Sequence, residues 1–439
     1  MLAFLLQTNA WITDGQLRLF ALFMTMIWTL WVIRVILASH YWPTQYSWYG
    51  TTSVIIPVVD EPEDLFREVL GRIVEQRPTE VLVVINGPRN RVLEKICADV
   101  GVQWHWTEIA GKRNAVRLGV ALSSGEISVL VDSDTLWTPG TLRELVKPFA
   151  DPAVGGVTTR QRILEPARNV LTRWADWLEN VRNEYSMPAM SVLGTVGCLP
   201  GRTIAFRRKI LIGCMDRFLT ERFLGVFLEV SDDRALTNYT LMAGYKTVYQ
   251  STSLVYTDAP TSLRKLVKQQ FRWARGSQYN TLRMLPWMLR ETPVLALFYA
   301  ADVVVPFVLV GSYLAWAVAV VHGEKTALYD QLPLPSQPWL ALASILALSL
   351  SMTVLSFAIR FGRHFSHRPR DMVYLPVFML INVFALMPIR VVGFLRMGHN
   401  AGWGTRSNAY QGATARNPQA LIPYLLGIAL LAGAVLISV

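Results

Sequence analysis

Long apolar runs lie towards both ends of this 439-residue chain, and a stretch of mixed polarity lies between them. Residues 17–38 are apolar except near their ends, and such a run is long enough to cross ~30 Å of hydrocarbon as a helix. Further apolar runs occupy 294–321, 338–359 and 420–439. The pattern predicts a membrane part built from both ends of the chain, with residues 1–16 as a short segment before the first transmembrane helix.

Residues 373–396 are also apolar, but they contain two prolines and two arginines. They form either a further crossing or a broken helix that lies on the membrane surface. We favour the surface helix, because the basic loop 360–370 and the polar loop 399–412 would then both face the cytoplasm. Residues 1–16 contain no Lys or Arg, so we expect the N-terminus outside and the central region, 45–260, in the cytoplasm.

The central region alternates short apolar runs with segments of helical spacing. The apolar runs, rich in β-branched residues, are 53–59, 81–85 and 127–131, and the segments of helical spacing are 64–76, 91–99 and 112–122. Strands that alternate with helices predict a mostly parallel sheet in an α/β domain, and strands apolar throughout indicate helices on both faces. Neither G-x-G-x-x-G nor a P-loop motif is present, which argues against a dinucleotide site and a P-loop nucleotide site.

Composition narrows the possible partners. Charged residues make up 17% of the chain, below the roughly 25% usual for soluble domains. The net charge of +11 is concentrated next to apolar segments and is not accompanied by a nucleic-acid recognition motif. We therefore expect a lipid bilayer and an anionic substrate as partners, and no nucleic acid. Three cysteines without C-x-x-C spacing argue against a disulfide framework or a zinc site.

Polar residues follow each of the three predicted strands: Asp60, Asn86 and Asp132. In a parallel sheet the carboxyl ends of the strands form one crevice, so we expect these residues to converge there. Asp132 and Asp134 place two carboxylates at one strand end. Carboxylate oxygens suit Mg²⁺ or Mn²⁺, which substrate phosphates usually complete.

Two further clusters carry charge at predicted helix starts. Lys112 and Arg113 oppose the helix dipole, which an anion bound there would relieve; the alternative is an ordinary surface pair. Asp232 and Asp233 follow Ser231, so one carboxylate could accept a proton from an attacking hydroxyl. The alternative is a helix N-cap with acids in the first turn, and both can hold at once.

Gln269, Arg272 and Trp273 share one face if residues 261–290 are helical. A guanidinium suits a diphosphate, and an indole suits the apolar face of a sugar. The segment is amphipathic and basic, as expected of helices on a membrane surface. The alternative is a basic, lipid-facing helix without a catalytic role.

Together, Asp-Ser-Asp-Thr, Asp-Asp-Arg, Gln-Gln-Phe-Arg-Trp and Trp-Gly-Thr-Arg resemble the motifs of processive family 2 glycosyltransferases. This family includes hyaluronan, chitin and cellulose synthases, and bacterial capsular polysaccharide synthases are similar. The resemblance implies a GT-A fold, a Mg²⁺- or Mn²⁺-bound UDP-sugar and inverting hexosyl transfer to a growing polysaccharide. It further implies export of a β-linked polymer through the enzyme's own channel in the bacterial inner membrane, with no protein partner evident.

The resemblance also assigns roles to single residues. The UDP contacts would come from Asp60, Glu61, Asn86, Lys112 and Asp132. Asp134 would be the metal ligand, and Asp233 the general base with Asp232 beside it. The diphosphate and acceptor sugar would contact Gln269, Arg272 and Trp273. Trp403 and Arg406 would belong to a gating loop, 399–412, that covers the nucleotide.

Some features depart from the family pattern. Hyaluronan synthases usually begin with two spans, whereas one is predicted here, and Ser231 stands where the family often has Gly. The segment 197–202 contains Arg202, which could recognise an acidic sugar such as glucuronate. The Asp-Asp-Arg and Trp-Gly-Thr-Arg motifs resemble hyaluronan-type synthases more than cellulose synthases, and the identity of the sugar stays open.

Two other functions are compatible with parts of the pattern. A non-processive lipid-linked sugar transferase on the same fold should lack Gln-x-x-Arg-Trp, which is present here. A transporter or receptor with a cytosolic α/β regulatory domain would not need Asp132, Asp134 and Asp233 together.

Overall fold

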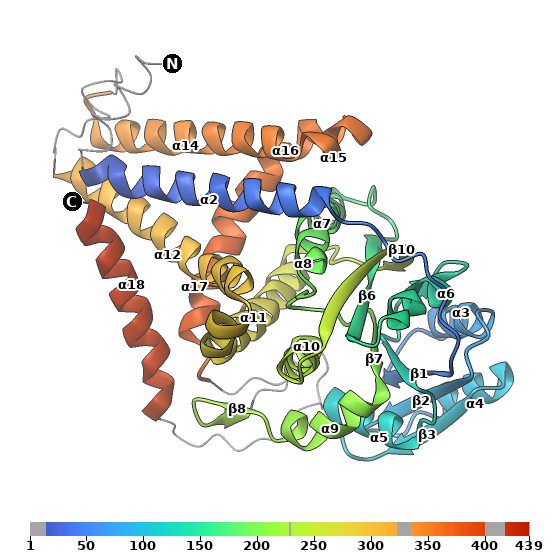
Figure 1. Ribbon diagram of the computed structural model, residues 1–439. Helices are drawn as coiled ribbons and strands as arrows, with labels where there is room; N and C mark the ends of the chain where they lie inside the picture. Colours follow the sequence, from blue (N-terminus) through green and yellow to red (C-terminus); the bar gives the residue numbers. More distant parts are fainter. Residues whose placement is uncertain (1–14, 228–229, 323–334, 400–417, 439) are drawn as a thin grey trace. The chain divides into compact units, whose positions relative to one another are not determined.

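The computed structural model describes residues 15–227, 230–322, 335–399 and 418–438 (Figure 1). Its contacts divide the chain into two compact units. The first, which we call the sheet unit, contains Arg34–Leu295 and His399–Asn417. The second, which we call the helical unit, contains the remaining residues. Each is described by itself.

The sheet unit is built on a mixed, mostly parallel sheet of eight strands in the order β3-β2-β1-β4-β7-β6-β10-β5. The strands are β1 (Thr52–Val58), β2 (Glu80–Asn86), β3 (Gln103–Thr107), β4 (Ile127–Val131), β5 (Leu136–Trp137), β6 (Val154–Ile163), β7 (Thr203–Arg207) and β10 (Lys246–Thr257). Strand β7 runs antiparallel to both of its neighbours, and β5 runs antiparallel to β10. The predicted parallel α/β sheet is confirmed, and the three predicted strands correspond to β1, β2 and β4.

Helices cover both faces of this sheet, which is why its central strands are apolar throughout. On one face Val54, Ile56 and Val58 of β1 share a core with α3, α4 and α6, and on the other Ile55 shares a core with α5, α9 and α10. These helices are α3 (Glu63–Val74), α4 (Arg91–Val100), α5 (Lys112–Leu122), α6 (Thr141–Val146), α9 (Arg208–Leu219) and α10 (Asp232–Met242). Strand β3 was not predicted, because its sequence, Gln-Trp-His-Trp-Thr, lies half-exposed at the sheet edge and lacks a continuous apolar run.

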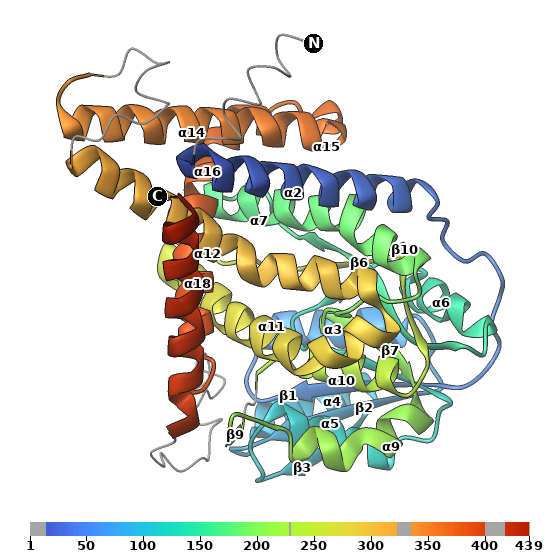
Figure 2. The same ribbon diagram turned by 60° about the vertical axis from the view of Figure 1, so that its left-hand side comes forward.

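Two longer helical segments complete the sheet unit. One consists of α7 (Val170–Val181), the π-helical turn η2 (Arg182–Ser186) and α8 (Met187–Val192). The other is α11 (Leu263–Glu291), a single 29-residue helix where the sequence suggested several shorter ones. Ser262 caps its start by accepting a hydrogen bond from the Lys265 backbone N–H. Helices α10 and α11 pack side by side (Figure 2), and a short hairpin of β8 (Arg222–Phe223) and β9 (Val226–Phe227) precedes α10.

The helical unit contains most of α2 (Gly15–Ser39) and α12 (Pro293–Val321), which both continue into the sheet unit, and several further helices. These are α14 (Pro338–Arg360), α15 (Gly362–His367), α16 (Asp371–Ile381), the π-helical turn η3 (Asn382–Leu386), α17 (Met387–Leu395) and α18 (Ile422–Ser438). The Phe307 and Phe394 rings meet edge to face at 5.0 Å, and the Tyr313 and Ser349 hydroxyls are 2.8 Å apart. Aromatic contacts and hydroxyl pairs of this kind hold apolar helices together where no water competes.

Four helices of the described residues are long and apolar enough to cross a membrane: Pro293–Ala315, Pro338–Arg360, Asp371–Leu395 and Pro418–Val435. The third covers the ambiguous 373–396 segment. It is one continuous helix with a π-helical turn in the middle, so the broken helix that we favoured is wrong in that respect. The predicted first span, 17–38, forms the helix α2. Which helices cross, and in which direction, stays a prediction.

Candidate active site

The Asp132–Asp134 segment lies where β4 ends. Because β7 pairs antiparallel with β4, with Val131 opposite Thr203, the start of β7 lies at the same edge as the end of β4. The backbone N–H of Asp132 donates to the Arg202 carbonyl over 3.1 Å, and a turn is closed by Thr135 N–H on the Asp132 carbonyl. Pairing of β4 with β7 therefore brings Arg202 beside the two aspartates, across about 70 residues of sequence.

Three carboxylates gather at this edge. The Ser133 hydroxyl donates to Glu61 Oε1 over 2.6 Å. Burial, together with the neighbouring carboxylates of Asp132 and Glu61, raises the pKa of Asp134 to about 6, and Arg202 and Lys112 offset only part of this rise. Excess negative charge on oxygen ligands suits a hard divalent cation. Among the residues described, no three His, Cys, Asp or Glu side chains form a ready metal site, so substrate oxygens would have to complete the coordination.

Lys112 faces the same carboxylates from the first turn of α5. Its Nζ lies 2.5 Å from Asp132 Oδ1. Asn86, at the end of β2, donates from Nδ2 to the Gly111 carbonyl over 2.9 Å and so holds the turn that precedes Lys112. Burial opposes the charge of Lys112, but the carboxylates of Asp132, Asp232 and Asp233 together raise its pKa. The alternative of an ordinary surface pair is wrong, because Arg113 is buried and Lys112, whose side chain is 20% exposed, is paired with Asp132.

Asp233 reaches the site from the first turn of α10. Its Oδ2 accepts from the Gly201 backbone N–H over 3.1 Å, and its Oδ1 accepts from the Arg234 backbone N–H over 2.8 Å. A Cβ atom on Gly201 would lie 3.4 Å from Asp233 Cβ and 3.7 Å from Lys112 Nζ. Asp233, Lys112 and the turn at Gly201 therefore meet at one point.

Ser231 is the residue before α10, as the N-cap interpretation predicted, and both acids lie in the first turn. Its side chain makes no capping hydrogen bond, however. Its φ is 63°, a left-handed conformation that favours Gly. Its hydroxyl occupies the space above Gly276 of α11, where a Cβ atom would come within 1.8 Å of Ser231 Oγ.

Arg202 is held by groups of the protein itself. One guanidinium nitrogen lies 2.8 Å from Glu179 Oε1 and 2.9 Å from Gln161 Oε1. Glu179 and Arg202 also line a small hollow with Gln269 and Trp273 of α11. Since Glu179 already neutralises Arg202, this geometry gives no support to the expectation that Arg202 recognises an acidic sugar.

Helix α11 places Gln269, Arg272 and Trp273 on one face, as the spacing predicted. Trp273 is 38% exposed, and Gln269 and Arg272 are half-buried. One turn further, Arg275 donates a hydrogen bond to the His399 carbonyl, so α11 contacts the residue at which the predicted gating loop begins.

Comparison with known proteins places the chain in a family. Residues 50–276, more than half of the chain, match the family described as "Glycosyltransferase like family 2". The chain belongs to glycosyltransferase family 2.

Its relatives are similar over most of their length. This glycosyltransferase is 27% identical to a hyaluronan synthase of Streptococcus pyogenes over 367 residues, which cover 81% of this chain and 83% of the relative. It is also 27% identical to an N-acetylglucosaminyltransferase of Rhizobium leguminosarum bv. viciae over 370 residues, 82% of each chain.

Among solved structures, a mannosyltransferase of Pyrobaculum calidifontis in complex with GDP-Man and Mn²⁺ is similar to this chain. The TM-score is 0.54 at 19% identity, with coverage of 83% of this chain and 99% of the other. The likeness agrees with the GT-A fold that the sequence predicted.

The structure does not gather every predicted site residue of the glycosyltransferase. Asp60 is exposed in the loop after β1 and takes no part in the contacts above. Asn86 is buried, and its hydrogen bond to the Gly111 carbonyl holds the turn before Lys112. Trp403 and Arg406 lie outside the described residues.

Sequence reasoning also missed residues that hold the site together. Gln161 and Glu179 fix Arg202, and Glu221 forms an ion pair with Arg113 over 2.9 Å. The local sequence gives no signal for them, because polar residues stand directly beside each one, and periodicity does not separate such positions from surface positions. The π-helical turn η2, a feature frequent at functional sites, follows directly after the helix that carries Glu179.

Proposed function

We propose that this glycosyltransferase is a membrane-embedded, processive, inverting polysaccharide synthase. It would transfer hexosyl units from UDP-sugars to a growing β-linked chain, hyaluronan-like or capsular, and export that chain through its own channel. The observation that supports this best is the meeting of Asp132 and Asp233 at Lys112, beside Asp134. A strand end and a helix start, about 100 residues apart in sequence, supply one set of groups for a donor and an acceptor.

Asp233 is the proposed general base. Its carboxylate would take the proton from the acceptor hydroxyl as the oxygen attacks the anomeric carbon. The new C–O bond would form as the bond from the anomeric carbon to the diphosphate oxygen breaks, so UDP leaves and the configuration inverts. The hydrogen bonds from the backbone N–H groups of Gly201 and Arg234 keep the Asp233 carboxylate fixed for this role.

The leaving diphosphate needs positive charge. Lys112 would supply part of it from the start of α5, and Arg272 would supply more from α11. Asp134, with Asp132 and Glu61 close by, has the oxygen donors that would hold Mg²⁺ or Mn²⁺, which when bound neutralises charge on the diphosphate. Trp273, exposed beside the hollow that Arg202 and Gln269 line, would stack on the acceptor sugar.

The membrane part of the proposal rests on the four helices that are long and apolar enough to cross a bilayer. It also rests on similarity to a hyaluronan synthase and an N-acetylglucosaminyltransferase, whose names indicate sugar transfer. We place the sheet unit in the cytoplasm of a bacterial cell, where UDP-sugars are made, with the N-terminus outside the inner membrane.

The test uses the full chain, purified into lipid nanodiscs, with Mg²⁺ or Mn²⁺ and labelled UDP-sugars supplied singly and in pairs. We expect UDP release together with long polymers from the first minutes, because a processive enzyme keeps its product. Digestion with linkage-specific hydrolases would then identify the sugar and the linkage. Products one or two sugars long, or a single sugar on a lipid, would contradict processive synthesis and favour the lipid-linked sugar transferase.

A further inference from the structure

Next to the proposed catalytic carboxylates lies a network of buried charged side chains that the reaction itself does not use. One member is Arg113, the second residue of α5, whose side chain is 1% exposed. Its Nε lies 3.4 Å from Asp232 Oδ1. On its other side the guanidinium lies 2.9 Å from Glu221 Oε2 and donates to the Phe218 carbonyl over 2.5 Å.

Glu221 is the centre of this network. Its side chain is 1% exposed, and both of its oxygens are used. Oε2 faces Arg113 and the Tyr279 hydroxyl, the latter at 3.2 Å. Oε1 faces Arg283, with which it forms an ion pair, and accepts from the Tyr239 hydroxyl over 3.1 Å. Burying a carboxylate so completely is costly unless cations and hydrogen-bond donors pair with it.

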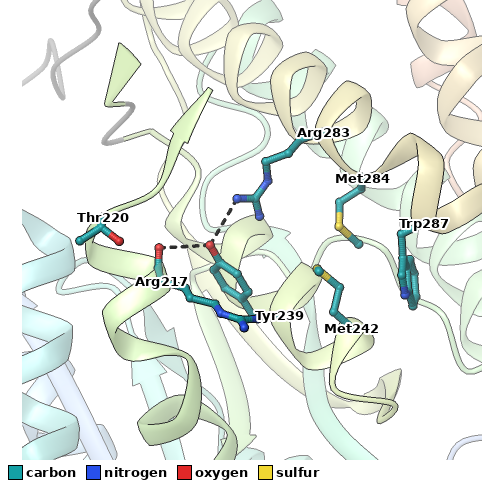
Figure 3. Close-up of a pocket in the computed structure, with 7 residues that line it drawn as sticks. All are labelled: Arg217, Thr220, Tyr239, Met242, Arg283, Met284 and Trp287. Carbon is teal, nitrogen blue, oxygen red and sulfur yellow. Dashed lines mark hydrogen bonds between the residues drawn. The ribbon is translucent and has the colours of Figure 1, made fainter. Parts of the chain in front are cut away.

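Arg283 is the member of the network that solvent reaches. It lines a hollow of about 360 Å³ between α9, α10 and α11, and Arg217, Met242 and Trp287 lie on the same walls (Figure 3). Within this hollow Arg283 also donates to the Tyr239 hydroxyl over 3.3 Å, drawn as a dashed line in Figure 3.

At the other end of the network is Asp232, the residue directly before the proposed base. Asp232 is 6% exposed. The charged groups that face it are Lys112 and Arg113 from α5, Asp233 beside it on α10, and Asp132 after β4. Burial raises the pKa of Asp232, the two cations lower it, and the two carboxylates raise it. Asp232 therefore lies between two cations and two carboxylates, directly beside the proposed base.

We propose that Arg113, Glu221 and Arg283 are positioning residues for the catalytic carboxylates. Within this network, which we call the relay, Arg283 orients Glu221, Glu221 orients Arg113, and Arg113 holds the Asp232 carboxylate in place beside Asp233. This inference rests on the proposed function, because it takes Asp233 as the base. It adds that activity depends on a guanidinium on α11 that does not touch the substrate.

The experiment uses Arg283→Ala in the full chain in nanodiscs. We expect turnover per folded enzyme to fall roughly 10- to 100-fold, as small displacements of catalytic groups do. Removing a positive charge from the relay disfavours the Asp232 carboxylate, so the acid limb of the pH–rate profile should move to higher pH. Because the truncated side chain enlarges a hollow open to solvent, added guanidinium ion should restore both turnover and the position of that limb.

Arg217→Ala is the matched control, because Arg217 lines the same hollow, whereas the ion pairs of Glu221 in the described part of the chain are with Arg113 and Arg283. It should keep wild-type turnover and show no response to guanidinium. Wild-type turnover in Arg283→Ala would overturn the relay. So would a variant in which guanidinium raises only the melting temperature, with the pH profile unmoved, because that result marks a purely structural ion pair.

The same assays separate this inference from the proposed function. If the wild-type protein releases no UDP from any UDP-sugar, the proposed function fails. If the wild type turns over and Arg283→Ala does so equally well, only the relay fails.

Discussion

Two groups of charges in the sheet unit differ in how far they are neutralised. In the acidic cluster, formed by Glu61, Asp132 and Asp134 at the sheet edge and by Asp233 of α10, the four carboxylates outnumber the two cations near them, Lys112 and Arg202. In the buried relay, one carboxylate, Glu221, lies between two guanidinium groups and two phenol hydroxyls.

The difference distinguishes charged side chains that are suited to bind a cation and a substrate from charged side chains that hold other residues in place. The acidic cluster raises the pKa of Asp134 to about 6, so the protein carries a local electrostatic strain that a cation and a substrate would relieve. The relay has no such excess, and removing any member of it would leave an uncompensated buried charge. Substitutions in the first group should therefore change turnover, and those in the second should change stability as well.

The largest expected effect is that of Asp233→Asn. Loss of a general base lowers turnover about 10²- to 10⁴-fold, while the melting temperature should hardly change because the amide oxygen still accepts one of the two hydrogen bonds. UDP release and intrinsic fluorescence melting measure the two quantities. Asp151→Asn, which removes an exposed carboxylate 3.1 Å from Lys246, is the control and should keep full turnover.

Glu221→Gln should show the opposite balance between folding and chemistry. It preserves the shape of the side chain but leaves Arg283 without its anion and Arg113 with only the more distant Asp232, which costs about 3–5 kcal/mol, or on the order of 10 °C in melting temperature. Asp134→Asn is the matched substitution in the acidic cluster. Its melting temperature should be unchanged or higher, because it relieves repulsion between like charges; a large loss there would contradict the distinction between the two groups.

A third prediction tests how closely α11 packs against the start of α10. Gly276→Ala places a methyl group within 1.8 Å of Ser231 Oγ and should destabilise the protein by about 1–3 kcal/mol. Ser231→Gly removes the hydroxyl and also suits the positive φ at that position. The double variant should therefore regain most of the lost stability in a melting experiment, and a strictly additive double variant would show that the two sites do not meet.

The smallest expected effect concerns pH and metal binding. Since a proton and a divalent cation compete for the Asp134 carboxylate, whose pKa is about 6, affinity should be constant above that pH and fall below it. The expected fall is about tenfold for each pH unit. Mn²⁺ binding in the presence of a non-transferable UDP-sugar analogue, followed by electron paramagnetic resonance between pH 4.5 and 7.5, measures it. A midpoint near the ordinary aspartate pKa would show that the neighbouring carboxylates do not act on Asp134.

Local patterns in the sequence predicted the strand that ends at Asn86, the strand directly before Asp132, the helix that begins at Lys112, and the helical face shared by Gln269 and Trp273. These features depend on apolar runs and on helical periodicity, which are properties of neighbouring residues. The motifs also sufficed to identify the family, since they are short and keep their spacing.

The partners of those residues were decided only by the tertiary structure. Arg202 lies beside Asp132 because β7 pairs antiparallel with β4, and Asp233 meets Lys112 because α5 and α10 both pack against α9 in one core. Nothing near Glu221 in the sequence indicates that it would be buried between two arginines from helices about 110 and 60 residues away. Burial turns an ordinary polar residue into a structural centre, and burial is a property of the packed fold rather than of the local sequence.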